Sequence, residues 1–259
     1  MKLICILTLT LLIFSGCVNR EYNAVTGRED IFFISTEHEI NMGRNIAESI
    51  ARNSEITLNP DPLMTERVIS IGNRLASVAD RQEVDYTFNV IDEKEMNAFA
   101  LPGGYIYVFK GLVEKVESDD ELASVLAHEI AHIVARHSIK RYQGGFGYNI
   151  IQILMVVSNS TVQDANRINA AFGQLIMSYS REDEALADRI ALKYLKKAGY
   201  NPAAMIDLLQ KLREEHRKAP IRPYTSYRSH PYIADRIRMV KQELTGQVSF
   251  SDYINKPIE

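Results

Sequence analysis

The residues best suited to chemistry lie in the stretch AHEIAH at 127–132, where His128, Glu129 and His132 form an HExxH pattern. Two histidines four residues apart lie on one face of an α-helix and can bind one zinc ion together. Glu129, between them, can reach a water molecule on that metal. The motif therefore predicts the active site of a zinc hydrolase.

The HExxH pattern supplies two zinc ligands, whereas a catalytic zinc ion usually takes three protein ligands and keeps a fourth position for water. The metzincin arrangement would need a glycine at position 135 and a histidine at position 138, but the chain has Ala135 and Ser138. His137 lies off the face shared by the motif histidines, and we expect it to be a surface or capping histidine at a helix end. The third ligand must therefore come from elsewhere in the chain.

Glu184 is the better choice for the third ligand. It stands four residues before Asp188 in SREDEALAD, so both carboxylates share one helical face. That arrangement suits a metal ligand and an acceptor for a histidine N–H. Acidic pairs with this spacing are also common on solvated helical faces, and only the upstream HExxH motif favours the zinc interpretation.

A helix that begins at Ser118 is expected to carry the HExxH motif. Ser118 and Glu121 have capping-box spacing, and Asp119 and Asp120 suit the positive end of the helix dipole. Apolar residues at helical intervals supply a buried side: Leu122, Val125, Leu126, Ile130 and Ile133. Core contacts should therefore fix the helix that presents the histidines.

Three extended stretches precede this helix, at residues 84–90, 97–101 and 105–109. We expect them to form a small antiparallel sheet. Asn97, Ala98 and Phe99 are candidates for an edge strand that binds an extended peptide substrate by β-augmentation. Phe99 is equally well explained as a core residue.

The rest of the pattern is mostly helical, with helices expected from Ser35-Thr36 and Asp61 and over residues 181–198, 201–218 and 231–244. The fold class is therefore α+β and mostly helical, with residues 35–259 as one catalytic domain. The apolar residues 148–157 are too few to span a membrane. They fit a core helix, a mobile flap over the cleft or a segment that touches a membrane.

The N-terminus has the pattern of an export signal, with Lys2 followed by the apolar run Leu3–Phe14. Residues 14–17, FSGC, resemble a bacterial lipobox, in which the cysteine is lipidated and becomes the first residue of the mature chain. We therefore expect a signal peptide at 1–16 and a lipidated tether at 17–34 that begins at Cys17. An ordinary cleaved signal with a chance cysteine is the alternative, and a retained transmembrane helix is disfavoured because the run is short.

Together these motifs resemble the gluzincin metallopeptidases of family forty-eight, which includes HtpX-like and prenyl-protein-processing proteases. The resemblance covers most of the chain after the N-terminus and rests on four stretches: AHEIAH, SREDEALAD, NAFALPGG at 97–104 and SHPYIADRI at 229–237. Within that family, the lipobox and the size look most like periplasmic outer-membrane lipoprotein proteases of the LoiP and BepA type. The resemblance implies a zincin-type catalytic domain.

The resemblance also implies roles for the motif residues. His128, His132 and Glu184 would bind one zinc ion per chain, and Asp188 would accept a hydrogen bond from the N–H of a histidine ligand. Glu129 would take a proton from water and pass it to the leaving amine.

Two further residues follow from the same resemblance. Arg236 would lie near the cleft and either stabilise developing oxyanion charge or pair with Asp188. His230 would be either a fourth zinc ligand, which inhibits until substrate or a partner moves it, or a histidine that braces the last helix.

The sequence therefore predicts a zinc-dependent endopeptidase of the bacterial envelope. Its lipid anchor would hold it on the outer membrane facing the periplasm, where it would degrade unfolded or misassembled proteins, with outer-membrane proteins as candidate substrates. The formal net charge of −3 gives no indication of a nucleic-acid partner. A zinc-stabilised, chaperone-like binding lipoprotein with little proteolysis is the alternative function, and a non-proteolytic zinc hydrolase is disfavoured by the extended edge before the metal helix.

Overall fold

The structure is a computed structural model that describes residues 19–23, 28–142, 179–218 and 230–246. The expected signal peptide, Cys17 and the apolar residues 148–157 lie outside the described residues. Among the described helices, none has the length and apolar character needed to cross a membrane.

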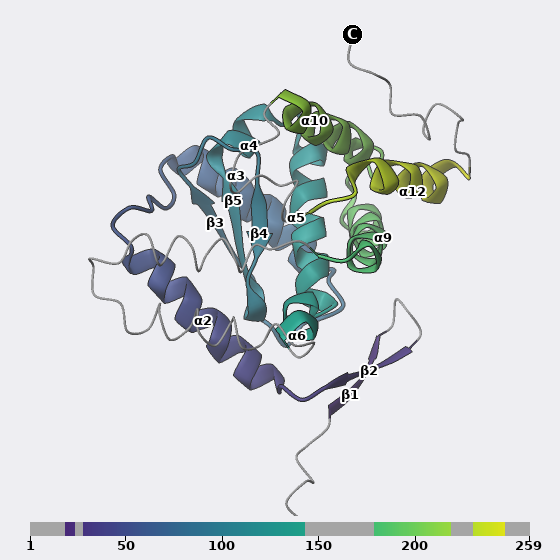
Figure 1. The fold of residues 1–259 in the computed structure, drawn as a ribbon. Helices are drawn as coiled ribbons and strands as arrows, with labels where there is room; N and C mark the ends of the chain where they lie inside the picture. The colour runs from purple at the N-terminus through teal and green to yellow at the C-terminus, as the bar shows by residue number, and fades with distance from the viewer. Residues whose placement is uncertain (1–18, 24–27, 143–178, 219–229, 247–259) are drawn as a thin grey trace, which may run out of the picture.

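The centre of the fold is a three-stranded sheet in the order β3 (Thr87–Ile91), β5 (Tyr105–Phe109) and β4 (Ala98–Ala100), shown in Figure 1. β4 is antiparallel to β5, but β3 is parallel to β5, so the expectation of an antiparallel sheet was wrong. The strands alternate in direction along the chain as in a meander, yet β5 is inserted between the other two. The first and third strands are therefore neighbours that run in the same direction.

The turn between β4 and β5 explains why these two strands pair so closely. It is the short 3₁₀ segment η1 (Pro102–Gly104), in which Gly103 has φ of 75° and Gly104 has φ of 105°. Only glycine adopts these angles without strain, which gives the sequence Pro-Gly-Gly its structural reason.

The two faces of the sheet pack against different helices. One face, with Phe88, Val90, Ile106 and Val108, joins the main core with α3 (Pro62–Ala76) and α5 (Asp119–Val134). The other face, with Ile91, Phe99, Tyr107 and Phe109, packs against α2 (Thr36–Arg52). The side chains of the strands thus alternate between two apolar layers. One layer holds α3 and α5 against the sheet, and the other holds α2.

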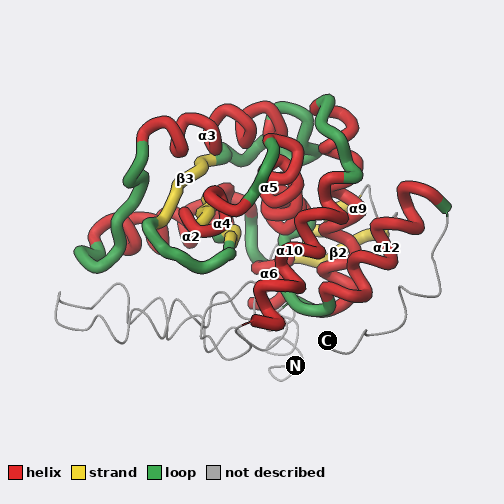
Figure 2. Tube along the Cα trace, turned by 90° about the horizontal axis from the view of Figure 1, so that it is seen from above, coloured by secondary structure: helices red, strands yellow, loops and turns green. Residues whose placement is uncertain are grey.

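Further helices lie on the side of α5 away from the strands, as Figure 2 shows: α9 (Arg181–Ala198), α10 (Ala204–Lys218) and α12 (Ile233–Thr245). α9 packs along α5, and α10 contacts both α5 and α12. The remaining described elements are the hairpin strands β1 (Asn19–Asn23) and β2 (Arg28–Phe32) and the short helices α4 (Lys110–Lys115) and α6 (His137–Arg141).

α5 has the beginning that the sequence predicts. Its N-cap is Ser118, whose side chain accepts a hydrogen bond from the main-chain N–H of Glu121. Its end is set by Arg136, which has φ of 52° in the left-handed region and turns the chain directly into α6. α5 is therefore a buried central helix with the sheet on one side and α9 on the other.

Candidate metal centre

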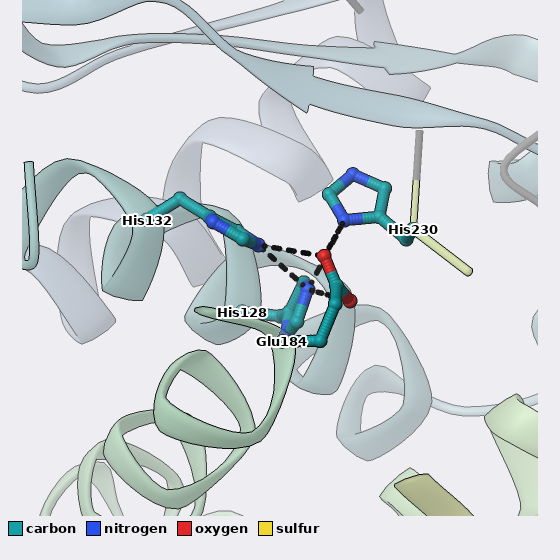
Figure 3. Close-up of side chains that lie close together, drawn as sticks. All are labelled: His128, His132, Glu184 and His230. Atoms are coloured by element: carbon teal, nitrogen blue, oxygen red, sulfur yellow. Dashed lines mark hydrogen bonds and ion pairs between the residues drawn. The ribbon is translucent and has the colours of Figure 1, made fainter. Parts of the chain in front are cut away.

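Four buried side chains from three parts of the chain meet beside α5, as Figure 3 shows. His128 and His132 come from α5, Glu184 comes from the first turn of α9, and His230 precedes α12. One potential ligand atom from each lies within 4.8 Å of every other. The predicted ligands His128, His132 and Glu184 are thus brought together, and His230 joins them.

The spacing of these atoms matches a tetrahedral metal site. The two Nε2 atoms of His128 and His132 are 3.0 Å apart, and they lie 3.4 and 3.5 Å from oxygens of Glu184. His230 Nδ1 lies 3.1 Å from Glu184 Oε1 and 3.3 Å from His128 Nε2. A tetrahedral zinc site with bonds of about 2.0–2.1 Å has ligand atoms about 3.3 Å apart. The four residues therefore have a zinc site's donor set, and their ligand atoms, all within 4.8 Å of one another, are close enough to share one ion.

The groups behind the two motif histidines direct their lone pairs to the same point. Asp188 accepts a hydrogen bond from His128 Nδ1 at 2.9 Å, which leaves Nε2 of that ring facing the cluster. On the other side of His132, His137 Nε2 lies 3.4 Å from Asp183 Oδ1. His132 Nδ1 and His137 Nδ1 lie 2.8 Å apart, and when His132 is the donor of this hydrogen bond its Nε2 presents a lone pair to the cluster. Two facing lone pairs need a cation between them.

The position of His137 differs from the sequence-based expectation. The side chain is completely buried and contacts the ring of His132, whereas we expected a surface or capping histidine. The physical reason is the left-handed residue Arg136: it ends α5 and folds α6 back beneath it, so helical periodicity does not continue to residue 137. Burial lowers the pKa of His137 to about 4, which keeps the ring neutral at pH 7.

The charges around the cluster also favour a cation. Burial alone would raise the pKa of Glu184, but Arg236 and His230 hold it well below its usual range. Burial alone would also raise the pKa of Asp188, but Arg236 and His128 hold it below its usual range. Burial and Arg236 lower the pKa of His128, but Asp188 and Glu184 raise it to about 9 overall. Without a metal, a proton on His128 would take the place of the cation.

Arg236 pairs with the carboxylates behind the ligands. Its Nε and Nη2 atoms donate to the two oxygens of Asp188 at 2.8 and 2.7 Å, and Nη1 lies 2.9 Å from Glu184 Oε2. Of the two roles that the resemblance left open, the structure displays the pairing with Asp188. Nη2 is also 3.4 Å from His128 Nε2, so the guanidinium borders the cluster.

Glu129 lies at the same cluster without being one of the four converging groups. Its side chain is buried, and Oε1 is 3.4 Å from His230 Nε2. Within the described residues, Glu129 Oε2 has no hydrogen-bond partner. A buried carboxylate oxygen with a free lone pair beside a metal site can accept a proton from water.

Tyr179 is a residue of this centre that the motifs do not indicate. Its ring stacks on His132 with centroids 3.9 Å apart and an interplanar angle of 23°. Its hydroxyl lies 3.4 Å from Ser138 Oγ. The only sequence signal is its place directly before the SREDEALAD stretch, so its contact with a ligand could not be foreseen.

The edge strand β4 runs beside α5. The main-chain groups of its successive residues point alternately toward β5 and away from it. Asn97 O accepts from Phe109 N and Leu101 N donates to Tyr105 O, so residues 97, 99 and 101 hydrogen-bond toward β5. Ala98 and Ala100 therefore direct their main-chain groups away from β5, and Ala98 N already donates to Asn97 Oδ1 at 2.9 Å. Asn97 and Phe99 hydrogen-bond toward the sheet, and Phe99 is a core residue stacked on Tyr107. Substrate binding at this edge stays a prediction.

Comparison with known proteins gives a consistent family assignment. The pattern of Peptidase family M48 matches residues 62–244, which include every residue of the cluster. The chain is 32% identical over 197 residues to a putative beta-barrel assembly-enhancing protease of Vibrio cholerae serotype O1, covering 72% of this chain and 40% of the relative. It is 30% identical over 217 residues to the beta-barrel assembly-enhancing protease of Escherichia coli K12, covering 79% and 43%.

The match to a mitochondrial relative covers a larger share of that relative's length. The mitochondrial metalloendopeptidase OMA1 of Schizosaccharomyces pombe is 29% identical over 231 residues, which cover 86% of this chain and 66% of the relative. By contrast, the chain spans less than half the length of the beta-barrel assembly-enhancing proteases that it matches.

Proposed function

The chain belongs to peptidase family M48, and on that premise we propose that it is a zinc-dependent endopeptidase whose ligands are His128, His132 and Glu184. The observation that carries the proposal is the convergence of these buried ligand atoms beside a carboxylate, Glu129, that has a free oxygen. When bound, zinc supplies Lewis-acid polarisation and lowers the pKa of a coordinated water toward about 7.

The residues of the chain then divide the remaining tasks. Ala100 and the main-chain oxygen of Ala98 pair with the main chain of an extended substrate and place a peptide bond beside the ligands. Glu129 accepts a proton from the attacking water through Oε2 and delivers it to the leaving amine nitrogen. Asp188 keeps the ring of His128 oriented, while Arg236 offsets the charge of the carboxylates and borders the site where negative charge develops on the substrate.

The direct test removes only the base. Glu129→Gln should retain zinc and lose cleavage of unfolded casein by at least a hundredfold, because the amide cannot accept the proton. Zinc content is measured by elemental analysis and cleavage by gel assay. Glu66→Gln, an exposed glutamate on α3, is the control and should match the wild type. Full hydrolysis by Glu129→Gln would remove Glu129 as the base.

His230 is proposed as an inhibitory fourth ligand. Its ring occupies the position that a reacting water and substrate require, 3.3 Å from His128 Nε2 and 3.1 Å from Glu184 Oε1. His230→Ala should therefore raise the rate of casein cleavage several-fold at equal zinc content. A rate that is unchanged or lower would instead favour a histidine that braces α12.

The closed set of four ligands also favours the second candidate function, a zinc-stabilised, chaperone-like binding lipoprotein. The two functions respond differently to loss of the base. A protease loses its effect on unfolded substrates in Glu129→Gln, whereas a binding protein still prevents their aggregation. Light scattering of a denatured substrate, measured beside the cleavage assay, separates them.

The substrates are proposed to be unfolded or misassembled envelope proteins, with outer-membrane proteins as one class. Support comes from relatives that are named for beta-barrel assembly and from the export pattern of the N-terminus. Comparison of the envelope proteomes of cells with wild type and Glu129→Gln tests this, because the inactive variant should accumulate the natural substrates. An identical set of proteins in both would contradict it.

Lipid anchoring at Cys17 is proposed from the lipobox pattern of residues 14–17. The anchor would place the enzyme on the periplasmic face of the outer membrane. Cys17→Ala should move the protein from the membrane pellet to the soluble periplasmic fraction. Unchanged membrane association of this variant would exclude the lipid as the anchor.

A further inference from the structure

Arg141, the last residue of the short helix α6, is an arginine without an acidic partner. In the part of the chain that the structure describes, its guanidinium carbon lies over the ring of Tyr179, 4.9 Å from the centroid, and no carboxylate is within ion-pair distance. By contrast, Arg81 and Arg136 at the end of α5 both pair with Glu39. Arg141 is half-buried, and its N–H donors remain available to an acceptor from outside.

The ring of Tyr179 holds this guanidinium group close to the metal centre. The same ring stacks on His132, with the two centroids 3.9 Å apart, and its hydroxyl lies 3.4 Å from Ser138 Oγ. A guanidinium group that stacks on an aromatic face keeps the N–H groups in its own plane free to bind a carboxylate. Arg141 is therefore separated from a metal-ligand ring by one aromatic side chain.

Arg141 also lies at one end of the substrate edge proposed for β4. It borders a pocket together with residues 99–102. At the other end of the strand, Ala98 borders a pocket together with His128 and Glu129. β4 and α5 lie side by side, and α6 follows at the end of α5, as Figure 1 shows. An extended peptide on this edge therefore passes both the metal centre and Arg141.

The polarity of that peptide decides which of its residues meets Arg141. Antiparallel pairing is the more stable form, and an antiparallel peptide runs from Ala100 toward Ala98. The part of the peptide at Arg141 then precedes the cleaved bond, so a carboxylate bound there belongs to a side chain and not to the C-terminus. A strand advances about 3.3 Å per residue, so a side chain that reaches across one aromatic ring comes from one of about three residues before the bond.

From this placement we propose that Arg141 binds the carboxylate of an aspartate or glutamate within the three residues that precede the cleaved bond. The proposal rests on the endopeptidase function above and adds a substrate preference to it. The guanidinium group can donate two parallel N–H···O bonds to a carboxylate. A glutamine side chain makes weaker hydrogen bonds there, and the charge of a lysine side chain is repelled.

Peptides that differ only by glutamate or glutamine at one position test this preference with the full-length wild type. Each of the three positions before the bond is varied in turn, and mass spectrometry of the products identifies the bond that is cleaved. At one of these positions, glutamate should exceed glutamine about tenfold in kcat/KM, and lysine should be the poorest. No acidic preference before the bond would overturn the subsite and leave the endopeptidase function intact.

Variants of Arg141 test whether this side chain is the cause. Arg141→Gln should bring the glutamate-to-glutamine ratio close to one, and Arg141→Glu should favour the lysine peptide instead. Arg141→Lys, which keeps the charge but not the planar fork, should recover part of the preference. Arg52→Gln removes the same charge from an exposed position on α2 and should keep the wild-type ratio. Equal ratios in Arg141→Gln and Arg52→Gln would overturn the assignment.

A binding measurement keeps the subsite testable if hydrolysis itself fails. Fluorescein-labelled glutamate and glutamine peptides are titrated with Glu129→Gln and followed by anisotropy. The glutamate peptide should bind about tenfold more tightly, and the double variant with Arg141→Gln should lose that difference. Equal affinities in Glu129→Gln would overturn the subsite, whereas a preference without wild-type hydrolysis would refute only the endopeptidase function.

Discussion

The ring of His132 contacts two other rings, and a carboxylate lies beyond one of them. His137 Nδ1 lies 2.8 Å from His132 Nδ1, Asp183 lies beyond His137, and Tyr179 covers the imidazole face. These contacts hold the orientation of the ring and give its Nδ1 atom a hydrogen-bond partner. Groups that orient a ligand in this way typically change metal affinity about 10–100-fold when they are lost.

At this scale we predict that His137→Leu weakens zinc binding about 10–100-fold. Leucine fills the space but cannot accept the hydrogen bond from His132, so that ring loses its orientation. Competition with a chromophoric chelator measures the affinity. His137→Asn, whose side-chain oxygen can accept the same hydrogen bond, should recover part of the loss.

The matched control is Ile139→Ala, which removes a fully buried side chain from the same short helix. It should lower the stability of the fold while zinc affinity stays near the wild-type value below the melting temperature. If Ile139→Ala weakens zinc binding as much as His137→Leu, general loosening of α6 explains both, and His137 has no specific role.

The sequence predicts this centre where one regular element carries the spacing, and fails where the chain turns. His128 and His132 share a face because α5 is a helix throughout, and Asp188 follows Glu184 by one turn of α9. His137 lies beyond a left-handed residue, where helical periodicity no longer applies. Its contact with His132 depends on a backbone angle that residue types alone do not specify.

Among the elements, α2 and the end of α5 are joined by a buried ion cluster. Arg81 donates from Nη1 and Nη2 to the two oxygens of Glu39, both at 2.8 Å, and Arg136 Nε lies 2.8 Å from Oε2. Arg81 Nη1 also donates to the main-chain oxygen of Ile133. Glu39 thus pairs with two buried guanidinium groups next to the helix that carries the metal ligands, and Glu83 also accepts from Arg81 Nε at 2.8 Å.

Glu39→Gln should therefore lower the free energy of unfolding by about 3–5 kcal/mol, the usual cost of breaking a buried ion pair by removing one of its members. Urea unfolding followed by circular dichroism measures the change. Glu48→Gln on the same helix removes an exposed partner of Arg52 and should change stability by less than about 1 kcal/mol. Equal effects of the two substitutions would contradict a structural role for the cluster.

The close approach of α2 to the turn η1 gives a second prediction for the elements. A Cβ on Gly43 would lie 1.8 Å from the main-chain oxygen of Pro102. Gly43→Ala should therefore destabilise the protein by about 1–3 kcal/mol, as overpacking does, although alanine usually stabilises a helix relative to glycine by about 1 kcal/mol. Asn45→Ala on the exposed face of α2 is the control. Thermal unfolding decides the sign, and a stabilised Gly43→Ala would show that the helix can move away from the turn.

The elements themselves were easier to predict than their arrangement. Ser118 and Asp61 begin helices where their capping patterns place them, because a cap is a contact between residues two or three apart. The direction of β3 relative to β5 depends instead on which strands become neighbours. That choice is made by the apolar layers on both sides of the sheet, which local sequence does not reveal.

For the molecule as a whole, the metal centre connects segments that are distant in sequence. Its ligands come from α5, from α9 and from the residue at position 230 that leads into α12. Bound zinc would therefore hold the helices on the far side of α5 against the central core. The same positions also bring imidazole nitrogens as close as 3.0 Å, and facing lone pairs at that distance repel one another unless a cation or a proton lies between them.

Removal of zinc should accordingly lower the melting temperature of the whole protein. A metal at 100 times its dissociation constant stabilises the folded state by about 2.7 kcal/mol, which corresponds to about 5–10 °C for a domain of this size. Calorimetry with and without a chelator measures the shift, and added zinc should reverse it. Glu184→Gln removes a ligand from α9 and should shrink the response to the chelator, whereas the exposed Glu66→Gln should retain it. A melting temperature that the chelator leaves unchanged in the wild type would contradict the view that one zinc ion joins these three segments, because ligands brought together only by folding must share their binding energy with the fold.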